Sequence, residues 1–554
     1  MLQQLLILLI LIITIVISSC LDNYIKKLDD AINITDNILD NIINRWQINQ
    51  FPNFLRSAAM SQTSWEVLKL KYQEKILKSV MIEKDINITS NISNKNDIIN
   101  VKFLISLLGS SVTAGHDSPF NESFSELLGP IMEPAFAPFF KLEVKNGALG
   151  NNPCLPYDVC VRTFAGADAD IVHWEQSFNC FGTDAKKSYV FEQFIRQALT
   201  MPNKPVIAFS DSAMPNWKED VCKEPAAKSP VTISPEEKRM LDYLRTGNAM
   251  KVVSELNKNE INRPWSALLN LFKEYKTLGI QMWLHDHYER YKCHGPYVAT
   301  WGCCSRSWHP SLLGHQLRAA HFAFFWLLIY KDALVELRKN GSEMLLKELH
   351  DAKKHIDHEL KHIPSKAIFD PMGFSDNMRC YTTFQPLGDP SLDMFKIVIP
   401  SGEGKNGFKN IIFEELTSPE IIKKAKASGY LDFKHLLYGN IDSGVLSFNI
   451  TVQKVGTAFL CQPCGNWGKL PNGFKYFWEI GTQIYLTKDI AAIPEGQFNF
   501  SPEKATNLKY TNRAPKDSQT ICVDFEMQFP AGQHILTIVP TTKDNIMVSY
   551  LLLP

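Results

Sequence analysis

Between Val101 and Leu337 the sequence alternates short apolar runs with helical stretches, and this alternation is the strongest constraint on the fold. Four runs have the length and composition of buried strands: Val101 to Leu108, Ile171 to Glu175, Val206 to Ser210 and Ile280 to Leu284. Helical stretches such as Tyr189 to Leu199 and Ala267 to Lys276 lie between them. This order predicts a parallel sheet with crossover helices, so residues 100–340 are expected to form an α/β domain.

The segments on either side of this region have different sequence patterns. Residues 21–99 show helical spacing and then a polar stretch, which predicts a helical lead-in and a linker. A long apolar helix is expected over Ser311 to Leu337, and residues 341–393 predict a charged helix and a second linker. Residues 394–554 contain β-rich runs separated by Gly, Pro, Asn and Asp, which predict a C-terminal all-β sandwich domain.

The first 20 residues have the features of a secretory signal. Leu5 to Ile17 is an apolar run broken only by Thr14, and the small residues Ser18 to Cys20 follow it. No basic residue precedes the run, and the run is nearly long enough to span a bilayer, so a cleaved signal peptide and an uncleaved signal anchor both remain open.

Glycosylation motifs favour the same pathway. Seven Asn-x-Ser/Thr motifs begin at Asn33, Asn87, Asn91, Asn121, Asn340, Asn449 and Asn499. Chance in an Asn-rich chain is the alternative explanation. We therefore predict a glycoprotein that is secreted or lies in the lumen of the secretory pathway.

The cysteines fit an oxidising compartment. Of the 12 cysteines, 11 remain if Cys20 leaves with the signal, and most of these are expected to form disulfides. The odd number leaves one cysteine unassigned. Cys461 and Cys464 form a CxxC motif that resembles half a zinc site, but no second CxxC follows, so disulfide bonding is the favoured interpretation.

Charge and composition exclude other classes of protein. Lys plus Arg number 58, as do Asp plus Glu, so the chain lacks the basic excess of a dedicated DNA- or RNA-binding protein. With 45% apolar residues, 28 Gly and 30 Pro it is neither collagen-like nor intrinsically disordered. Most of the chain is expected to fold, and nucleic acid is not an expected partner.

Four short segments contain the parts of a nucleophilic active site. The first predicted strand ends in a small-residue turn that would place the Ser111 hydroxyl at the carboxyl end of the sheet, where ligands bind in open α/β sheets. The backbone N–H of Gly150 and the side chain of Asn179 follow later sheet ends and could bind an oxyanion. Pro310 favours an extended conformation of His309 and would start the next helix at its first position, so this imidazole is the candidate base. Each segment alone also has a purely structural explanation.

In this order the segments resemble the SGNH, or GDSL-type, hydrolase family. Ser111 matches its first block, Gly150 its second, Asn179 its third and His309 its last, and the resemblance covers residues 100–335. It implies a three-layer, flavodoxin-like fold and ester hydrolysis through a covalent acyl-serine. It also implies that Ser111 is the nucleophile, that Ser111, Gly150 and Asn179 donate to the oxyanion, and that His309 is the base. No metal or organic cofactor is implied.

The sequence departs from the family pattern at three positions. Ser110 replaces the Asp of Gly-Asp-Ser, Cys180 replaces the Asp after Asn179, and Arg306 replaces the acid three residues before His309. Loss of the acid would lower the rate by orders of magnitude unless another group orients the imidazole. Asp286, after the fourth predicted strand, is the candidate substitute, with a purely structural Asp as the alternative. A backbone carbonyl could also orient the imidazole.

Two further motifs allow a functional or a structural interpretation. Residues 358–362 read H-E-x-x-H, the pattern of a helical zinc site, but the charged surroundings, the helix-ending Pro364 and the lack of a third ligand favour a chance match on a polar helix. Trp467 and the aromatic residues 476–478 could form a sugar-stacking platform, but they are more typical of a sandwich core.

The sequence as a whole predicts a secreted serine esterase that hydrolyses carboxylic esters of an acylated carbohydrate or lipid. The alternatives are a catalytically inactive glycan-binding or cell-surface protein on the same scaffold, which the acid missing at Arg306 favours, and a lumenal O-acyltransferase that uses the same serine. The expected partner is a small-molecule or glycan ester, with membrane anchoring open only for residues 1–20 and no oligomeric state implied.

Overall fold

The chain forms two compact units. The first comprises Met1–Ile105, Asn121–Val144 and Val206–Ile363, and the second comprises Ser106–Phe120, Lys145–Pro205 and Pro364–Pro554. The structure, a computed structural model, describes residues 2–46, 58–60, 62–88, 101–116, 119–150, 152, 154–176, 189–211, 274–275, 278–281, 305–306, 309–310, 312–340, 354, 363, 367, 374–399, 407–417, 419, 423, 432–463, 470–488, 500–512 and 520–554. Within these ranges some residues, among them 2–21 and His309, are described by their backbone alone.

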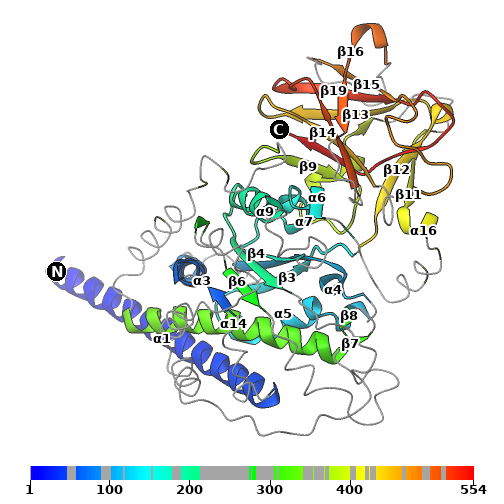
Figure 1. The fold of residues 1–554 in the computed structure, drawn as a ribbon. Coiled ribbons are helices and arrows are strands. Elements are labelled where there is room, and N and C mark those ends of the chain that lie inside the picture. Colours follow the sequence, from blue (N-terminus) through cyan, green and yellow to red (C-terminus); the bar gives the residue numbers. More distant parts are fainter. Residues whose placement is uncertain are drawn as a thin grey trace, which may run out of the picture. The chain divides into compact units, whose positions relative to one another are not determined.

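The α/β part contains a six-stranded sheet in the order β1-β6-β5-β4-β2-β3, of which β3, β4 and β6 are labelled in Figure 1. Its strands are β1 (Ala58–Met60), β2 (Lys102–Gly109), β3 (Lys141–Asn146), β4 (Ile171–Glu175), β5 (Val206–Asp211) and β6 (Leu278–Gln281). Strand β6 pairs parallel with β5 and antiparallel with the edge strand β1. Without β1, the strands follow the flavodoxin-like order 2-1-3-4-5 in chain order. The predicted α/β architecture is confirmed.

Strand β3 runs parallel to β2. Backbone hydrogen bonds join Lys141 N to Val101 O at 2.9 Å, Gly147 N to Leu107 O at 3.0 Å and Leu149 N to Gly109 O at 3.1 Å. Strand β3 is not among the predicted strands, because its alternating polar and apolar residues lack the apolar run of a central strand. Its place at the edge of the sheet explains this composition. By contrast β4, in the interior of the sheet, is buried along its whole length.

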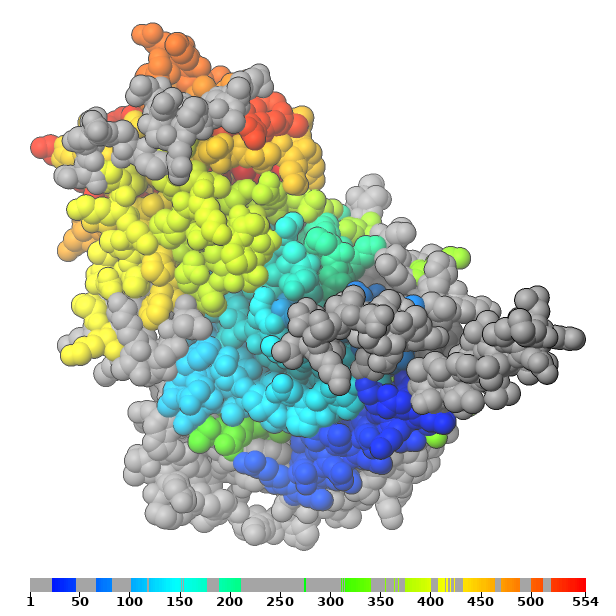
Figure 2. All heavy atoms as spheres, turned by 180° about the vertical axis from the view of Figure 1, so that it is seen from behind, coloured from blue at the N-terminus to red at the C-terminus, as the bar shows by residue number. Residues whose placement is uncertain are grey.

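The helices of the first unit pack around α14 (Leu312–Asn340). This helix contacts α1 (Leu2–Trp46), α3 (Gln62–Ile88) and α5 (Phe124–Phe136). Part of α1 lies at the surface, in dark blue, with small parts of α14 in green beside it (Figure 2). Because neighbours surround it, α14 is buried along most of its length, which explains its apolar sequence and matches the long helix predicted over 311–337.

Aromatic rings and ion pairs hold these helices together. Tyr330 of α14 makes edge contacts with Phe136 of α5 and Tyr72 of α3, at centroid distances of 4.3 and 5.3 Å. Lys331 pairs with Asp36 of α1 at 2.5 Å. In the part of the chain whose side chains are described, no helix is both long and apolar enough to cross a bilayer.

The second unit contains the short helices α4 (Ser111–Ala114), α6 (Cys154–Tyr157), α7 (Val161–Ala165) and α9 (Tyr189–Leu199). Two of them, α7 and α9, are linked to the start of its C-terminal region. A disulfide joins Cys160 to Cys380, and Arg162 pairs with Asp389 at 2.9 Å. The guanidinium of Arg196 makes two hydrogen bonds to the Asp376 carboxylate, at 2.8 and 2.7 Å. These links fix residues 376–389 against α7 and α9 within the unit.

The rest of the C-terminal region is antiparallel β-structure (Figure 1). Two five-stranded sheets have the orders β10-β13-β19-β15-β16 and β17-β18-β14-β21-β9, and a small sheet has the order β11-β12-β20. Their strands are β9 (Arg379–Thr382), β10 (Val398–Ile399), β11 (Lys409–Ile412), β12 (His435–Gly439), β13 (Leu446–Val452), β14 (Phe459–Pro463), β15 (Gln483–Thr487), β16 (Thr506–Asn507), β17 (Tyr510–Asn512), β18 (Thr520–Phe525), β19 (Gly532–Val539), β20 (Ile546–Val548) and β21 (Tyr550–Leu553). The predicted all-β character is confirmed.

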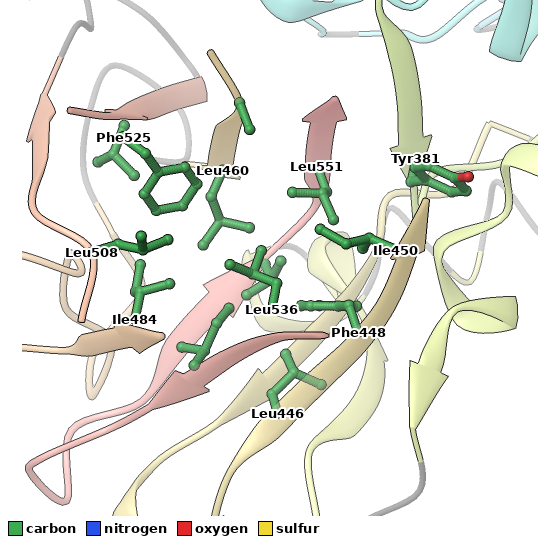
Figure 3. Packing of buried hydrophobic residues seen from close by; sticks show 14 of the residues in the cluster. Tyr381, Leu446, Phe448, Ile450, Leu460, Ile484, Leu508, Phe525, Leu536 and Leu551 are labelled. Carbon is green, nitrogen blue, oxygen red and sulfur yellow. The ribbon is translucent and has the colours of Figure 1, made fainter. Parts of the chain in front are cut away.

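An apolar core lies among these sheets (Figure 3). Phe448 and Ile450 of β13 belong to the core with Leu536 of β19 and Leu551 of β21, and all four are buried. Buried residues of β13 alternate with exposed ones toward its end, as in a strand with one solvent face.

A disulfide joins Cys461 to Cys522, which lie directly opposite each other on β14 and β18. The disulfide interpretation of Cys461 is therefore confirmed, whereas Cys464 lies outside the described residues. Among the β-rich runs of this region, residues 476–486 are extended only from Gln483, because a turn precedes the strand in which Gly481 has a φ of 60°.

Candidate active site

The turn between β2 and α4 contains one hydroxyl residue that is not buried. Ser110 is the N-cap of α4 and its Oγ accepts a hydrogen bond from Val112 N at 3.2 Å. Ser110 is 2% exposed and Thr113 is fully buried, whereas Ser111, the first residue of the helix, is partly exposed. Ser111 is therefore the least buried of the three hydroxyl residues of this turn.

Close packing makes glycine necessary before this turn. A Cβ at Gly109 would lie 2.2 Å from Thr113 Oγ1 and 3.0 Å from the carbonyl oxygen of Glu175. The Ser110 N–H donates to that same carbonyl at 2.8 Å. The end of β4 therefore directly supports the serine turn.

The loop that ends at Gly150 is tied to the serine turn. The Tyr157 hydroxyl donates to Gly147 O at 2.7 Å and accepts from Gly109 N at 3.3 Å. Burial raises the pKa of Tyr157 well above its ordinary value, so the phenol stays protonated and can fill both roles. Asn146 adds a second link, because its Nδ2 donates to Thr113 O at 3.0 Å while its Oδ1 accepts from Ala148 N at 3.1 Å.

Two charged residues from the C-terminal region hold the peptide groups of Gly150. Gly150 N donates to Asp432 Oδ2 at 2.8 Å, and Lys434 Nζ donates to Gly150 O at 2.6 Å. His116 Nε2 lies 2.7 Å from the same Asp432 oxygen. A Cβ at Gly150 would lie 2.1 Å from the His116 ring, so a glycine is required there as well.

Asp432 is an anion in a largely buried place. Burial alone would raise its pKa, but the ion pair with His116, the charge of Lys434 and the N–H of Gly150 outweigh burial and hold the pKa below its ordinary value. This cluster could not be predicted from the sequence, because 282 positions separate Asp432 from Gly150 and no motif surrounds Asp432. In the structure a carboxylate thus accepts the N–H predicted to bind an oxyanion.

The predicted site residues differ in how far the structure describes them. Ser111 and Gly150 belong to the same unit and lie on loops that Tyr157 joins. Asn179 and Asp286 lie outside the described residues. His309 is described by its backbone alone, so its predicted role as base, like the roles of Asn179 and Asp286, stays a prediction.

The segment around His309 is extended. Strand β8 (His309–Pro310) pairs antiparallel with β7 (Ser305–Arg306), and Arg306 lies opposite His309. The following helix begins at Leu312 and not at Pro310, because Pro310 is paired with Ser305. Pro310 therefore does not occupy the first position of this helix, although the helix itself matches the one predicted over 311–337.

Of the H-E-x-x-H and aromatic motifs, the structure describes only part of the aromatic one. Residues 358–362, the H-E-x-x-H match, lie outside the described residues, as does Trp467. No group of His, Cys, Asp or Glu in the described ranges is arranged to hold a metal ion. Phe477 is buried in the sandwich core as predicted, but Tyr476 and Trp478 stack on each other at 4.6 Å and Trp478 is 37% exposed.

The comparisons with known proteins are sparse. No family model and no curated protein matches the sequence. Two solved structures of a two-domain esterase (CEX) active on acetylated mannans, one of them co-crystallised with mannopentaose, are similar at 11% identity. They cover 81% of this chain and 90% and 91% of their own chains, with TM-scores of 0.34 and 0.31. At these values the likeness supports neither a shared chemistry nor a shared substrate. The fold and the serine turn by themselves define an α/β protein with a partly exposed serine at a strand-to-helix turn.

Proposed function

We propose that the protein is an SGNH-type serine esterase that hydrolyses carboxylic esters of an acylated carbohydrate or lipid. The observation that carries this proposal is the position of Ser111, a partly exposed serine at the carboxyl end of a parallel strand between two buried hydroxyl residues. Ligand sites of flavodoxin-like sheets lie at this end of the strands. The resemblance of the sequence to the SGNH family supports the reaction type.

In the proposed reaction the Ser111 oxygen attacks the ester carbonyl carbon. The serine proton passes to an imidazole, for which His309 is the candidate, and the carbonyl oxygen becomes an oxyanion. The backbone N–H groups of Ser111 and Gly150 and the side chain of Asn179 are the proposed donors to that oxyanion. Collapse expels the alcohol, which takes the proton from the imidazole, and water then hydrolyses the acyl-serine by the reverse sequence. Asp286 is the proposed orienting carboxylate.

Asp432 adds a condition to this reaction. Its carboxylate accepts the Gly150 N–H, so an oxyanion has to displace it before Gly150 can donate. Two negative groups cannot share one donor without repulsion, because electrostatic interactions are strong in a buried site. We therefore expect Asp432 to slow acylation in the state that the structure describes.

The same contact favours the second candidate function. A chain whose oxyanion donor is permanently occupied, and whose expected acid is replaced by Arg306, would be an inactive glycan-binding protein on an esterase scaffold. The exposed Trp478 is the described residue that fits such binding. A serine that reacts would exclude this alternative.

The proposed setting is the secretory pathway. The disulfides Cys160–Cys380 and Cys461–Cys522 fit an oxidising compartment. We propose that residues 1–20 act as a signal peptide or anchor and that residues 394–554 form an accessory domain after the hydrolase-like domain, residues 100–340.

The test is hydrolysis of a panel of acetylated and longer-chain acyl esters of sugars, polysaccharides and glycerol by the full-length protein. Ser111→Ala is compared with Ser391→Ala, a change at an exposed serine of the C-terminal region. The proposal predicts turnover by the wild type and Ser391→Ala but not by Ser111→Ala. Full turnover by Ser111→Ala would reject the serine mechanism.

A further inference from the structure

Glu175 is a buried acidic residue that the proposed reaction does not use. It is the last residue of β4 and its exposed fraction is 0%. Its Oε2 accepts hydrogen bonds from Ser110 Oγ at 2.7 Å and from Thr113 Oγ1 at 2.8 Å, and the Ser110 N–H lies 3.3 Å away. Glu175 therefore contacts residues on both sides of Ser111.

This carboxylate is an expensive group to bury. Burial of a carboxylate costs free energy unless ion pairs and hydrogen bonds compensate. Among the described residues no cation pairs with Glu175, and its second oxygen, Oε1, has no hydrogen-bond partner there. The hydrogen bonds from the serine turn are thus the main compensation for the cost of burying Glu175. We therefore expect Glu175 to act mainly on the structure of that turn.

The contacts of Glu175 also give the two adjacent serines different roles. A serine hydroxyl has a single proton to donate. The Ser110 hydroxyl donates a hydrogen bond to Glu175, and its oxygen accepts one from Val112 N, so this hydroxyl is committed to the structure of the turn. Ser111, by contrast, is a partly exposed residue.

We propose that Glu175 is a positioning residue for Ser111. Its carboxylate holds Ser110 and Thr113, and through them it fixes the direction of the Ser111 side chain. The inference rests on the proposed function, because it concerns the reactivity of Ser111. Ser110 occupies the position of the Asp in the Gly-Asp-Ser pattern, and the carboxylate is supplied here from the end of β4.

The first test is Glu175→Gln, which keeps the size of the side chain and removes its charge. Glu143→Gln is the matched control, because Glu143 is a partly exposed acid of β3 that pairs with Lys102. We expect Glu175→Gln to lower kcat and the rate of labelling of Ser111 by a fluorophosphonate about ten- to hundredfold, as small misplacements of reacting groups do. We expect KM and the control to stay at wild-type values.

A second test asks whether Glu175 acts through the two hydroxyls. Ser110→Ala and Thr113→Val each remove one donor to Glu175. If the carboxylate positions Ser111 through them, a double variant that combines Glu175→Gln with one of these changes loses less labelling rate than the product of the two single losses. Losses that multiply fully would show that Glu175 acts by another route and would overturn the inference.

The outcomes separate the inference from the proposed function. Labelling of Ser111 at the wild-type rate in folded Glu175→Gln overturns the inference and leaves the esterase proposal intact. Absence of Ser111 labelling in the folded wild type rejects the esterase proposal itself. If Glu175→Gln does not fold, the double variant Ser110→Ala, Thr113→Val decides, because a comparable loss of labelling supports the inference and a wild-type rate overturns it.

Discussion

The loops around Ser111 and the C-terminal sandwich belong to the same unit but are held together in different ways. The sandwich core consists of apolar side chains such as Phe448, Ile484 and Leu536 that pack without directional bonds (Figure 3). The loops are held by buried polar groups, chiefly Glu175 and Tyr157. Apolar packing stabilises the fold over a wide area, whereas hydrogen bonds fix the direction of single groups. Substitutions in the two regions should therefore separate stability from reactivity.

The largest expected effect on stability lies in the sandwich. Phe448→Ala removes a fully buried ring and should lower the free energy of unfolding by about 3 to 5 kcal/mol. Denaturant unfolding measures this loss, and the rate of Ser111 labelling per folded molecule should stay unchanged. A lowered rate in the folded fraction would show that the two regions are coupled.

The next largest effect, on the rate of Ser111 labelling, should come from Asp432→Ala, which releases the Gly150 N–H. One oxyanion donor is worth roughly 100- to 1,000-fold in rate, so even its partial release should raise Ser111 labelling by about tenfold. The measurement is the second-order rate constant of labelling. A lower rate in the folded variant would mean that Asp432 supports the site and that Gly150 is not an oxyanion donor.

A pair of tyrosine substitutions compares the two regions directly. Tyr157→Phe removes the bridge between Gly109 and Gly147, and Tyr510→Phe removes a hydroxyl that donates to Phe477 O and Thr482 O in the sandwich. Each should lower the free energy of unfolding by about 1 to 3 kcal/mol, since buried backbone groups lose a partner. Only Tyr157→Phe should also slow labelling. Equal rates in both variants would contradict the proposed link between the loops.

The smallest effect should be a pH dependence of stability. The pKa of Asp432 is lower in the folded chain than its ordinary value, so its ionised form stabilises the fold above the unfolded pKa of about 3.9. This contribution is lost as the pH falls through the folded pKa. The free energy of unfolding of Asp432→Asn should therefore differ most from the wild type near neutral pH and approach it below about pH 4. A difference that does not change with pH would contradict the assignment.

Local patterns predicted the elements of the fold but not the contacts around the site. The runs at Val101, Ile171 and Val206 became β2, β4 and β5, because a central parallel strand is apolar along its whole length. The edge strand β3 lacks such a run and was missed. The turn at Ser111 was also predicted from a local pattern, the small residues that directly follow the first strand.

The supporting charges followed no local pattern. Glu175 lies 65 positions from Ser110, and Asp432 lies 282 positions from Gly150, so tertiary folding alone brings each pair together. Asp432 also lies in the region that the sequence assigned to an accessory domain. Hydrophobic periodicity predicts which face of a helix or strand is buried, but it does not predict which distant side chain contacts that face.

The most direct test of the central claim is the site of covalent modification. The folded full-length protein is treated with a fluorophosphonate, and the adduct is located by peptide mass spectrometry. The account predicts a single stoichiometric adduct on Ser111 that is absent from Ser111→Ala. An adduct on Ser110 or elsewhere, or no adduct on the folded wild type, would contradict it.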